Sequence, residues 1–130
     1  MSANRPISDI LRRRPLVSAD PEMSVREASR LMASERIGAL PVVRDGRLIG
    51  IFTERDALVR VLARDLLPDE TPLSEVMTAN PVTIDARRPF RHALQMMVDG
   101  GFRHVPVIDG GSVVGVVSAR DALGDLEPRQ

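Results

Sequence analysis

Two stretches of the sequence match each other over 22 positions without a gap. Residues 37–58 read IGALPVVRDGRLIGIFTERDAL, and residues 102–123 read FRHVPVIDGGSVVGVVSARDAL. Aligned at an offset of 65 positions, from Pro41 to Pro106, they share Pro-Val, two glycines and a closing Arg-Asp-Ala-Leu. The apolar residues between these anchors coincide as well. The chain therefore contains two copies of one small unit, and this repeat determines the fold.

The similarity continues on the N-terminal side of both stretches. Residues 7–11 (ISDIL) match residues 73–77 (LSEVM), but at an offset of 66, so the first copy has one additional residue. We divide the chain into repeat 1, residues 1–68, and repeat 2, residues 69–130, with residues 69–72 as the linker. Because a unit of about 60 residues is marginal by itself, the repeats should share a core and should not fold separately.

Each repeat predicts the element order β-α-β-β-α. Apolar runs at residues 16–17 and 82–84 each precede a helix, which starts at a Ser24–Glu27 capping box in repeat 1 and at Pro89 in repeat 2. Asp-Gly pairs between apolar runs then predict hairpins. Their strands are expected at residues 39–43 and 48–52, and at residues 104–108 and 113–117. A second helix opens at Thr53 or Ser118.

The composition excludes several classes of function. Basic and acidic residues number 18 each, so the net charge does not favour nucleic acid or an anionic membrane as a partner. Lysine and cysteine are absent, which removes Schiff-base, Walker-lysine and thiolate chemistry. His92 and His104 lack a third ligand at a recognisable spacing, so no metal site is expected. No signal-peptide or membrane-spanning run occurs, and we expect a cytoplasmic protein that is not an enzyme and holds no catalytic cofactor.

Candidate functional residues lie where each second helix opens, in Thr53-Glu54-Arg55-Asp56 and Ser118-Ala119-Arg120-Asp121. One interpretation is a capped helix, with a hydroxyl at the N-cap and a carboxylate in the first turn. The other is a nucleotide site. A helix start, a hydroxyl and an arginine suit phosphate, while a carboxylate accepts hydrogen bonds from ribose hydroxyls.

Over about residues 7–126, the repeated element order, with a Pro-Val strand before the hairpin and a [Thr/Ser]-x-x-Asp motif after it, resembles the CBS domain family. The resemblance is to a tandem pair, known as a Bateman module. It implies an α/β fold (α+β by some schemes) of two β-α-β-β-α repeats with pseudo-twofold symmetry. It also implies clefts between the repeats that bind an adenine nucleotide (AMP, ADP or ATP) or another adenosyl ligand. Such a module would form a homodimer and signal to a regulated protein.

The resemblance assigns roles to individual residues. Asp121 and Asp56 would hold ribose, Ser118 and Thr53 would contact phosphate, and Arg120 and Arg55 lie within the same motifs. Positions that would hold adenine are Thr83, Ile84, Val105 and Pro106 in repeat 2, and Val17, Leu40 and Pro41 in repeat 1. For the apolar members of this set, simple core packing is the competing interpretation.

Repeat 2 has the stronger case for a site. Arg103 and His104 precede its strand proline, and the resemblance makes them phosphate contacts, whereas repeat 1 has Gly38-Ala39 there. An exposed strand end is the alternative for this pair. Two rival functions stay open for the chain: a structural or dimerisation module with empty clefts, and a nucleic-acid module that uses Arg12-Arg13-Arg14.

Overall fold

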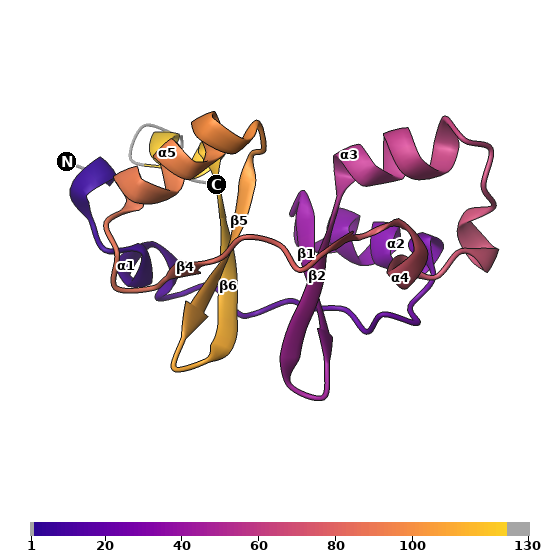
Figure 1. The fold of residues 1–130 in the computed structure, drawn as a ribbon, viewed down its shortest axis with the longest axis horizontal. Helices are drawn as coiled ribbons and strands as arrows, with labels where there is room; N and C mark the ends of the chain where they lie inside the picture. The colour runs from indigo at the N-terminus through magenta and orange to yellow at the C-terminus, as the bar shows by residue number, and fades with distance from the viewer. Residues whose placement is uncertain (1, 125–130) are drawn as a thin grey trace. The chain divides into compact units, whose positions relative to one another are not determined.

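The computed structural model describes residues 2–124, which fold into two compact units. Residues 17–81 form one unit, here called the central unit. Residues 1–16 join residues 82–130 in the other, here called the terminal unit. The compact units therefore do not coincide with the sequence repeats: each repeat keeps its hairpin and first helix, but the segment that precedes them lies in the other unit (Figure 1).

A β-hairpin is the centre of each unit. In the central unit β1 (Ala39–Arg44) pairs with β2 (Arg47–Thr53), and in the terminal unit β5 (His104–Asp109) pairs with β6 (Ser112–Ser118). The register shifts between Val42 and Val43 in one hairpin and between Val107 and Ile108 in the other, at equivalent positions. Both predicted hairpins are thus confirmed, with strand ends that differ from the prediction by one residue.

The third strand differs between the two sheets. In the central unit β3 (Thr78–Ala79) pairs antiparallel with β2, giving the order β1-β2-β3. In the terminal unit β4 (Ile84–Asp85) pairs parallel with β5, giving the order β4-β5-β6. The central unit has only an isolated parallel bridge, Ala19 to Val42, at the position equivalent to β4.

One amphipathic helix follows each entering segment, as the sequence predicted. Helix α2 (Val25–Glu35) starts at Ser24, whose hydroxyl accepts the Glu27 N–H at 3.1 Å, and α5 (Phe90–Gly100) starts after Pro89. The apolar faces of these helices enter the two cores. The core of the central unit contains Ala19, Val25, Ala28, Met32, Leu40, Val42, Phe52, Val61, Leu73 and Val76. The core of the terminal unit contains Ile7, Leu11, Ile84, Ala86, Phe90, Ala93, Met97, Val105, Val107 and Val117.

Two short helices complete the cores, and each comes from the other sequence repeat. Helix α1 (Ile7–Leu11) buries Ile7 completely in the terminal unit, and the Ile7 N–H donates to Arg88 O at 2.9 Å. Helix α4 (Leu73–Val76) buries Leu73 in the central unit, and the Leu73 N–H donates to Met23 O at 2.9 Å. Each fully buried aliphatic side chain contributes about 1.5–3 kcal/mol. The repeats therefore exchange their leading segments.

The predicted linker is part of the central unit rather than a free connection. Residues Pro68–Glu70 form a 3-10 turn, η3. Thr71 is buried, its hydroxyl donates to Leu67 O at 2.8 Å, and its carbonyl accepts the Val25 N–H at 2.9 Å. The chain passes between units at residues 16–17 and 81–82 instead.

The second helices are less regular than the sequence suggested. In the central unit α3 (Glu54–Asp56) continues as a π-helix, η2 (Ala57–Leu62), which buries Val61 and exposes Leu58 and Leu62. In the terminal unit the equivalent residues form a 3-10 helix, η4 (Ala119–Leu123). Another 3-10 turn, η1, covers Ser2–Asn4. A proline ends a helix, so Glu127-Pro128 predicts the end of this second helix in repeat 2, but these residues lie outside the described ones. Within residues 2–124, no helix has the length and apolar character needed to cross a membrane.

Candidate functional site

The proposed ribose ligand of repeat 2, Asp121, is a well-held carboxylate in the terminal unit. Its Oδ2 accepts the Ser118 N–H at 2.8 Å, which ties the carboxylate to the start of η4. Its Oδ1 accepts a hydrogen bond from the Arg14 guanidinium at 2.5 Å. The Asp121 side chain is 10% exposed, whereas that of Arg14 is 47% exposed. One oxygen of Asp121 therefore serves the local backbone, and the other binds an arginine 107 residues away in the sequence.

The hairpin brings the predicted phosphate contacts of repeat 2 to the same end of the sheet. His104 is the strand partner of Ser118, and the Ala119 N–H donates to Arg103 O at 3.0 Å. The side chains of Arg103 and Arg120 are exposed, and that of His104 is half-buried. The two stretches that the sequence singled out, residues 103–104 and 118–121, are thus adjacent in the terminal unit.

The residues proposed to hold adenine in repeat 2 differ in exposure. Ile84 pairs with Val107, so the entering strand lies alongside β5, and Thr83 is exposed just before it. Ile84 and Val105 belong to the hydrophobic core, and Pro106 is also buried. The core interpretation therefore applies to these side chains, and a base near them would have to meet backbone groups and the exposed Thr83.

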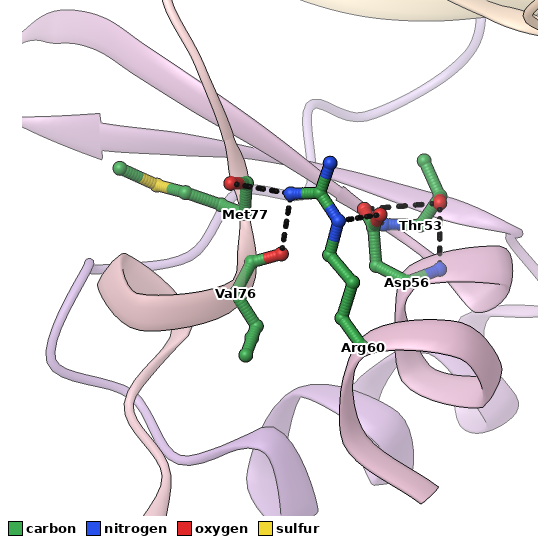
Figure 2. A network of polar contacts seen from close by, with 5 residues as sticks. All are labelled: Thr53, Asp56, Arg60, Val76 and Met77. Atoms are coloured by element: carbon green, nitrogen blue, oxygen red, sulfur yellow. Dashed lines mark hydrogen bonds and ion pairs between the residues drawn. The ribbon is translucent and has the colours of Figure 1, made fainter. Parts of the chain in front are cut away.

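The equivalent carboxylate of repeat 1, Asp56, lies in a denser polar network in the central unit (Figure 2). Asp56 Oδ2 accepts the N–H and the hydroxyl of Thr53, at 2.9 and 3.1 Å, while the Asp56 N–H donates to the Thr53 hydroxyl at 3.2 Å. Arg60 lies one turn further along, with its Nε 3.5 Å from Asp56 Oδ1. Arg60 also donates to the carbonyls of Val76 and Met77, at 3.2 and 3.1 Å. This network joins the motif to the segment that follows α4.

The remaining candidates of repeat 1 form no charged surface comparable to that of repeat 2. Leu40 and Pro41 are buried and Val17 is half-buried, so core packing accounts for them. Arg55 is exposed. Gly38 and Ala39 occupy the positions of Arg103 and His104, and the Glu54 N–H donates to Gly38 O at 3.0 Å. The backbone arrangement is thus repeated, but the basic side chains are not.

Sequence reasoning did not identify the two arginines that pair with these carboxylates. Arg60 had a readable signal, since it follows Asp56 by four residues on a predicted helix. The position equivalent to Arg60 in repeat 2 is Asp125, at the same offset of 65, so the sequence offers Asp121 no such partner nearby. Arg14 reaches Asp121 only because the leading segment belongs to the terminal unit, and no local pattern indicated this.

A separate pair, Asp85 and Arg87, has a clear electrostatic consequence. The Arg87 guanidinium donates to both carboxylate oxygens of Asp85, at 3.0 Å each, and the Arg87 N–H donates at 2.8 Å. These hydrogen bonds lower the pKa of Asp85 from 3.8 to about 2, and the bond to the Arg87 side chain has a larger effect than the bond to its backbone. Asp85, the last residue of β4, therefore stays an anion over the physiological pH range.

The comparison with known families agrees with this repeated architecture. A model of the CBS domain matches the chain twice, over residues 7–63 and 73–127. The chain belongs to the CBS domain family. It is thus a tandem CBS pair, and each matched domain contributes its leading segment to one compact unit and its hairpin and first helix to the other.

CBS domain-containing proteins of different length are similar to this chain in sequence. The CBS domain-containing protein CBSCBSPB5 of Arabidopsis thaliana is 42% identical over 104 residues, which are 79% of this chain and 19% of that protein. The CBS domain-containing protein YhcV of Bacillus subtilis is 35% identical over 115 residues, 88% of this chain and 79% of that protein. The chain therefore spans about a fifth of the length of the plant relatives.

Solved structures with the same fold include complexes with adenosyl compounds. An uncharacterized conserved protein from Pyrococcus horikoshii has a TM-score of 0.86 and 31% identity, over 100% of this chain and 98% of that one. The CBS domain pair of protein MJ0100, in complex with 5-methylthioadenosine and S-adenosyl-L-methionine, has a TM-score of 0.82 and 30% identity, over 95% and 100%. The CBS domain protein PAE2072 from Pyrobaculum aerophilum, complexed with AMP, has a TM-score of 0.79 and 30% identity, over 90% and 89%.

Proposed function

We propose that this CBS pair is a regulatory module that binds an adenosyl ligand, AMP foremost, and signals to a partner protein without catalysis. The observation that carries the proposal is the presence of AMP and of S-adenosyl-L-methionine in two solved CBS structures that are each 30% identical to this chain. A regulatory role requires that the ligand bind two states of the module with different affinities.

The site of repeat 2 is the better candidate for this ligand. Asp121 supplies a carboxylate for the ribose hydroxyls, Arg103 and Arg120 supply positive charge, and His104 adds an imidazole at the same end of the sheet. Phosphate groups favour such a cluster because arginine offers a planar fork of charged donors. In repeat 1 the equivalent strand start is Gly38-Ala39, so Asp56, Thr53 and Arg55 would form a weaker site.

A thermal-shift panel tests the proposal directly. The full chain is heated with AMP, ADP, ATP, S-adenosylmethionine and NAD, each at several concentrations. A ligand at 100 times its Kd stabilises the folded state by about 2.7 kcal/mol, which raises the Tm of a domain of this size by several degrees. The proposal fails if no adenosyl compound raises the Tm at millimolar concentration while the protein unfolds cooperatively.

The second candidate function, a structural module without a ligand, is favoured by a specific observation. Asp56 and Asp121 each accept the backbone N–H of the residue that caps their own helix, and both face an arginine. Local capping and ion pairing would be reason enough for these carboxylates to be present. A nucleic-acid function is less well supported, since Arg12 and Arg14 are already paired with Asp9 and Asp121.

We further propose that the protein forms a homodimer through the exposed apolar face of η2. Leu58, Val59 and Leu62 are 61, 47 and 59% exposed on this π-helix, and adjacent exposed apolar side chains are typical of association surfaces. Analytical ultracentrifugation of the wild type and of Leu58→Glu/Leu62→Glu tests the interface. A wild-type monomer at 100 µM, or a dimer that survives the double substitution, would contradict it.

A further inference from the structure

The Arg14 guanidinium forms an ion pair with the Asp121 carboxylate, which is the group proposed to bind ribose. Asp121 Oδ2 accepts the Ser118 N–H, so Oδ1 is the oxygen that this backbone contact leaves to other donors. Arg14 binds that oxygen, and with Arg14 in place only 10% of the Asp121 side chain is exposed. A ribose hydroxyl that approaches Oδ1 therefore meets the guanidinium first.

Arg14 is well placed to leave Asp121 at low cost. Its side chain is 47% exposed, and exposed or half-exposed ion pairs contribute little to stability because water solvates the separated charges well. Among the described residues, its guanidinium makes its hydrogen bond to Asp121 and to no carbonyl. Arg60, the equivalent partner in the central unit, is held by two backbone carbonyls as well as by Asp56. Arg60 is therefore held in place by several contacts, whereas Arg14 can dissociate from Asp121 by breaking one ion pair.

Arg14 lies next to the segment that connects the two units, so its release from Asp121 would affect that segment. Arg14 lies two residues before Leu16, at which the chain leaves the terminal unit for Val17 of the central unit. The Arg14 N–H donates to Leu11 O at 2.9 Å, so the residue also closes the end of α1. The position equivalent to Arg14 in the other leading segment is Asn80, at an offset of 66, which carries no charge. Among the described residues, the leading segment of repeat 1 is thus the one whose own side chain, Arg14, is paired with a proposed ribose carboxylate just before the connection at residues 16–17.

We propose that Arg14 is a latch that occupies Asp121 and must be displaced by the ribose hydroxyls of an adenosyl ligand. This inference rests on the proposed function. Binding exchanges the Arg14–Asp121 pair for ribose–Asp121 hydrogen bonds, and it frees the segment that connects the two units. The latch lowers the affinity for the ligand and converts occupancy of the site into a change at the connection, as a regulatory module requires.

The test compares three proteins and two ligands by calorimetric titration. The proteins are the full-length wild type, Arg14→Gln, and Arg13→Gln as a control that removes the same charge from the adjacent exposed residue. The ligands are AMP and 2′,3′-dideoxy-AMP, which lacks both hydroxyls that Asp121 would bind. Because the arginine of the competing ion pair is half exposed, Arg14→Gln should bind AMP about two- to fivefold more tightly than the wild type. Its affinity for the dideoxy ligand should match that of Arg13→Gln.

A second readout follows the connection itself. In the wild type, saturating AMP should accelerate hydrogen exchange at the Arg14 amide by at least several-fold, since release of the side chain loosens the end of α1. In Arg14→Gln this amide should exchange fast with or without AMP.

Each other outcome overturns the latch. If Arg14→Gln binds AMP more weakly than Arg13→Gln, Arg14 is a phosphate ligand; if the two variants bind equally, the ion pair does not compete. An equal gain for AMP and the dideoxy ligand would point to a general effect and not to the ribose. If no protein of the set binds AMP, the latch fails together with the AMP form of the proposed function, whereas binding without an Arg14 effect refutes the latch alone.

Discussion

Substitution of Asp121 by alanine separates ligand binding from helix capping. Hydrogen bonds to a charged group contribute about 1.5–3 kcal/mol, and the ribose would lose at least one of them. The same substitution removes the competing Arg14 contact, which offsets about 0.5–1 kcal/mol of that loss. The net loss is about 1–2 kcal/mol, or roughly five- to thirtyfold in the Kd for AMP. In an Arg14→Gln background the offset disappears, and Asp121→Ala should cost tenfold or more.

Asp56→Ala is the matched control, because it removes the equivalent carboxylate from the central unit. Asp56 accepts two hydrogen bonds from Thr53 and faces Arg60, so its loss should lower the free energy of unfolding by about 1–2 kcal/mol. It should change AMP affinity less than Asp121→Ala does. Calorimetry and urea unfolding of both variants measure the two effects. If capping is the only role of Asp121, its removal costs about 0.3–1 kcal/mol of stability and leaves AMP affinity unchanged, which would refute the ribose assignment.

Three further predictions concern stability and charge. Fragments 1–68 and 69–130 should each give poorly dispersed NMR spectra, because each lacks the short helix that completes its core. Fragment 17–81 is a complete central unit and should give a better dispersed spectrum. Native-like spectra of the first two fragments would contradict the exchange of leading segments. Arg60→Met, which loses the bonds to Val76 and Met77, should destabilise the protein by about 1–2 kcal/mol in urea, against no measurable change for the exposed control Arg64→Met. Arg87→Gln should raise the pKa of Asp85 from about 2 part of the way toward 3.8, as read from a carboxyl NMR titration. Because that pKa is lowered in the folded state, the stability it contributes is present above about pH 4 and is lost as the pH falls toward 2; a pKa unchanged in the variant would exclude Arg87 as the cause.

The hairpins and amphipathic helices could be predicted because their signals are local. The turn residues with positive φ are Asp45-Gly46 in one hairpin and Gly110-Gly111 in the other, and both pairs favour such a turn. The apolar spacing of the helices determines which face is buried. The irregular second helices could not be predicted. Both second helices open on the same Arg-Asp-Ala-Leu sequence, and they diverge after it, where Val59 in the central unit is replaced by Gly124 in the terminal unit. The shared motif alone therefore does not predict a π-helix in one unit and a 3-10 helix in the other.

The exchange of leading segments explains a pair of equivalent glycines in the repeat, whose role is clear only from the structure. Gly50 and Gly115 coincide in the alignment, although both lie in strands, where glycine is unfavourable. A Cβ on Gly115 would lie 3.0 Å from a methyl carbon of Leu11, and a Cβ on Gly50 would collide with Met77. Leu11 and Met77 are themselves equivalent residues of the two leading segments. Each glycine thus makes room for the leading segment of the other repeat, and in the terminal unit that segment also carries Arg14, which pairs with Asp121. The segment that completes the core of the terminal unit is therefore the same segment that brings Arg14 to Asp121, the residue proposed to bind ribose.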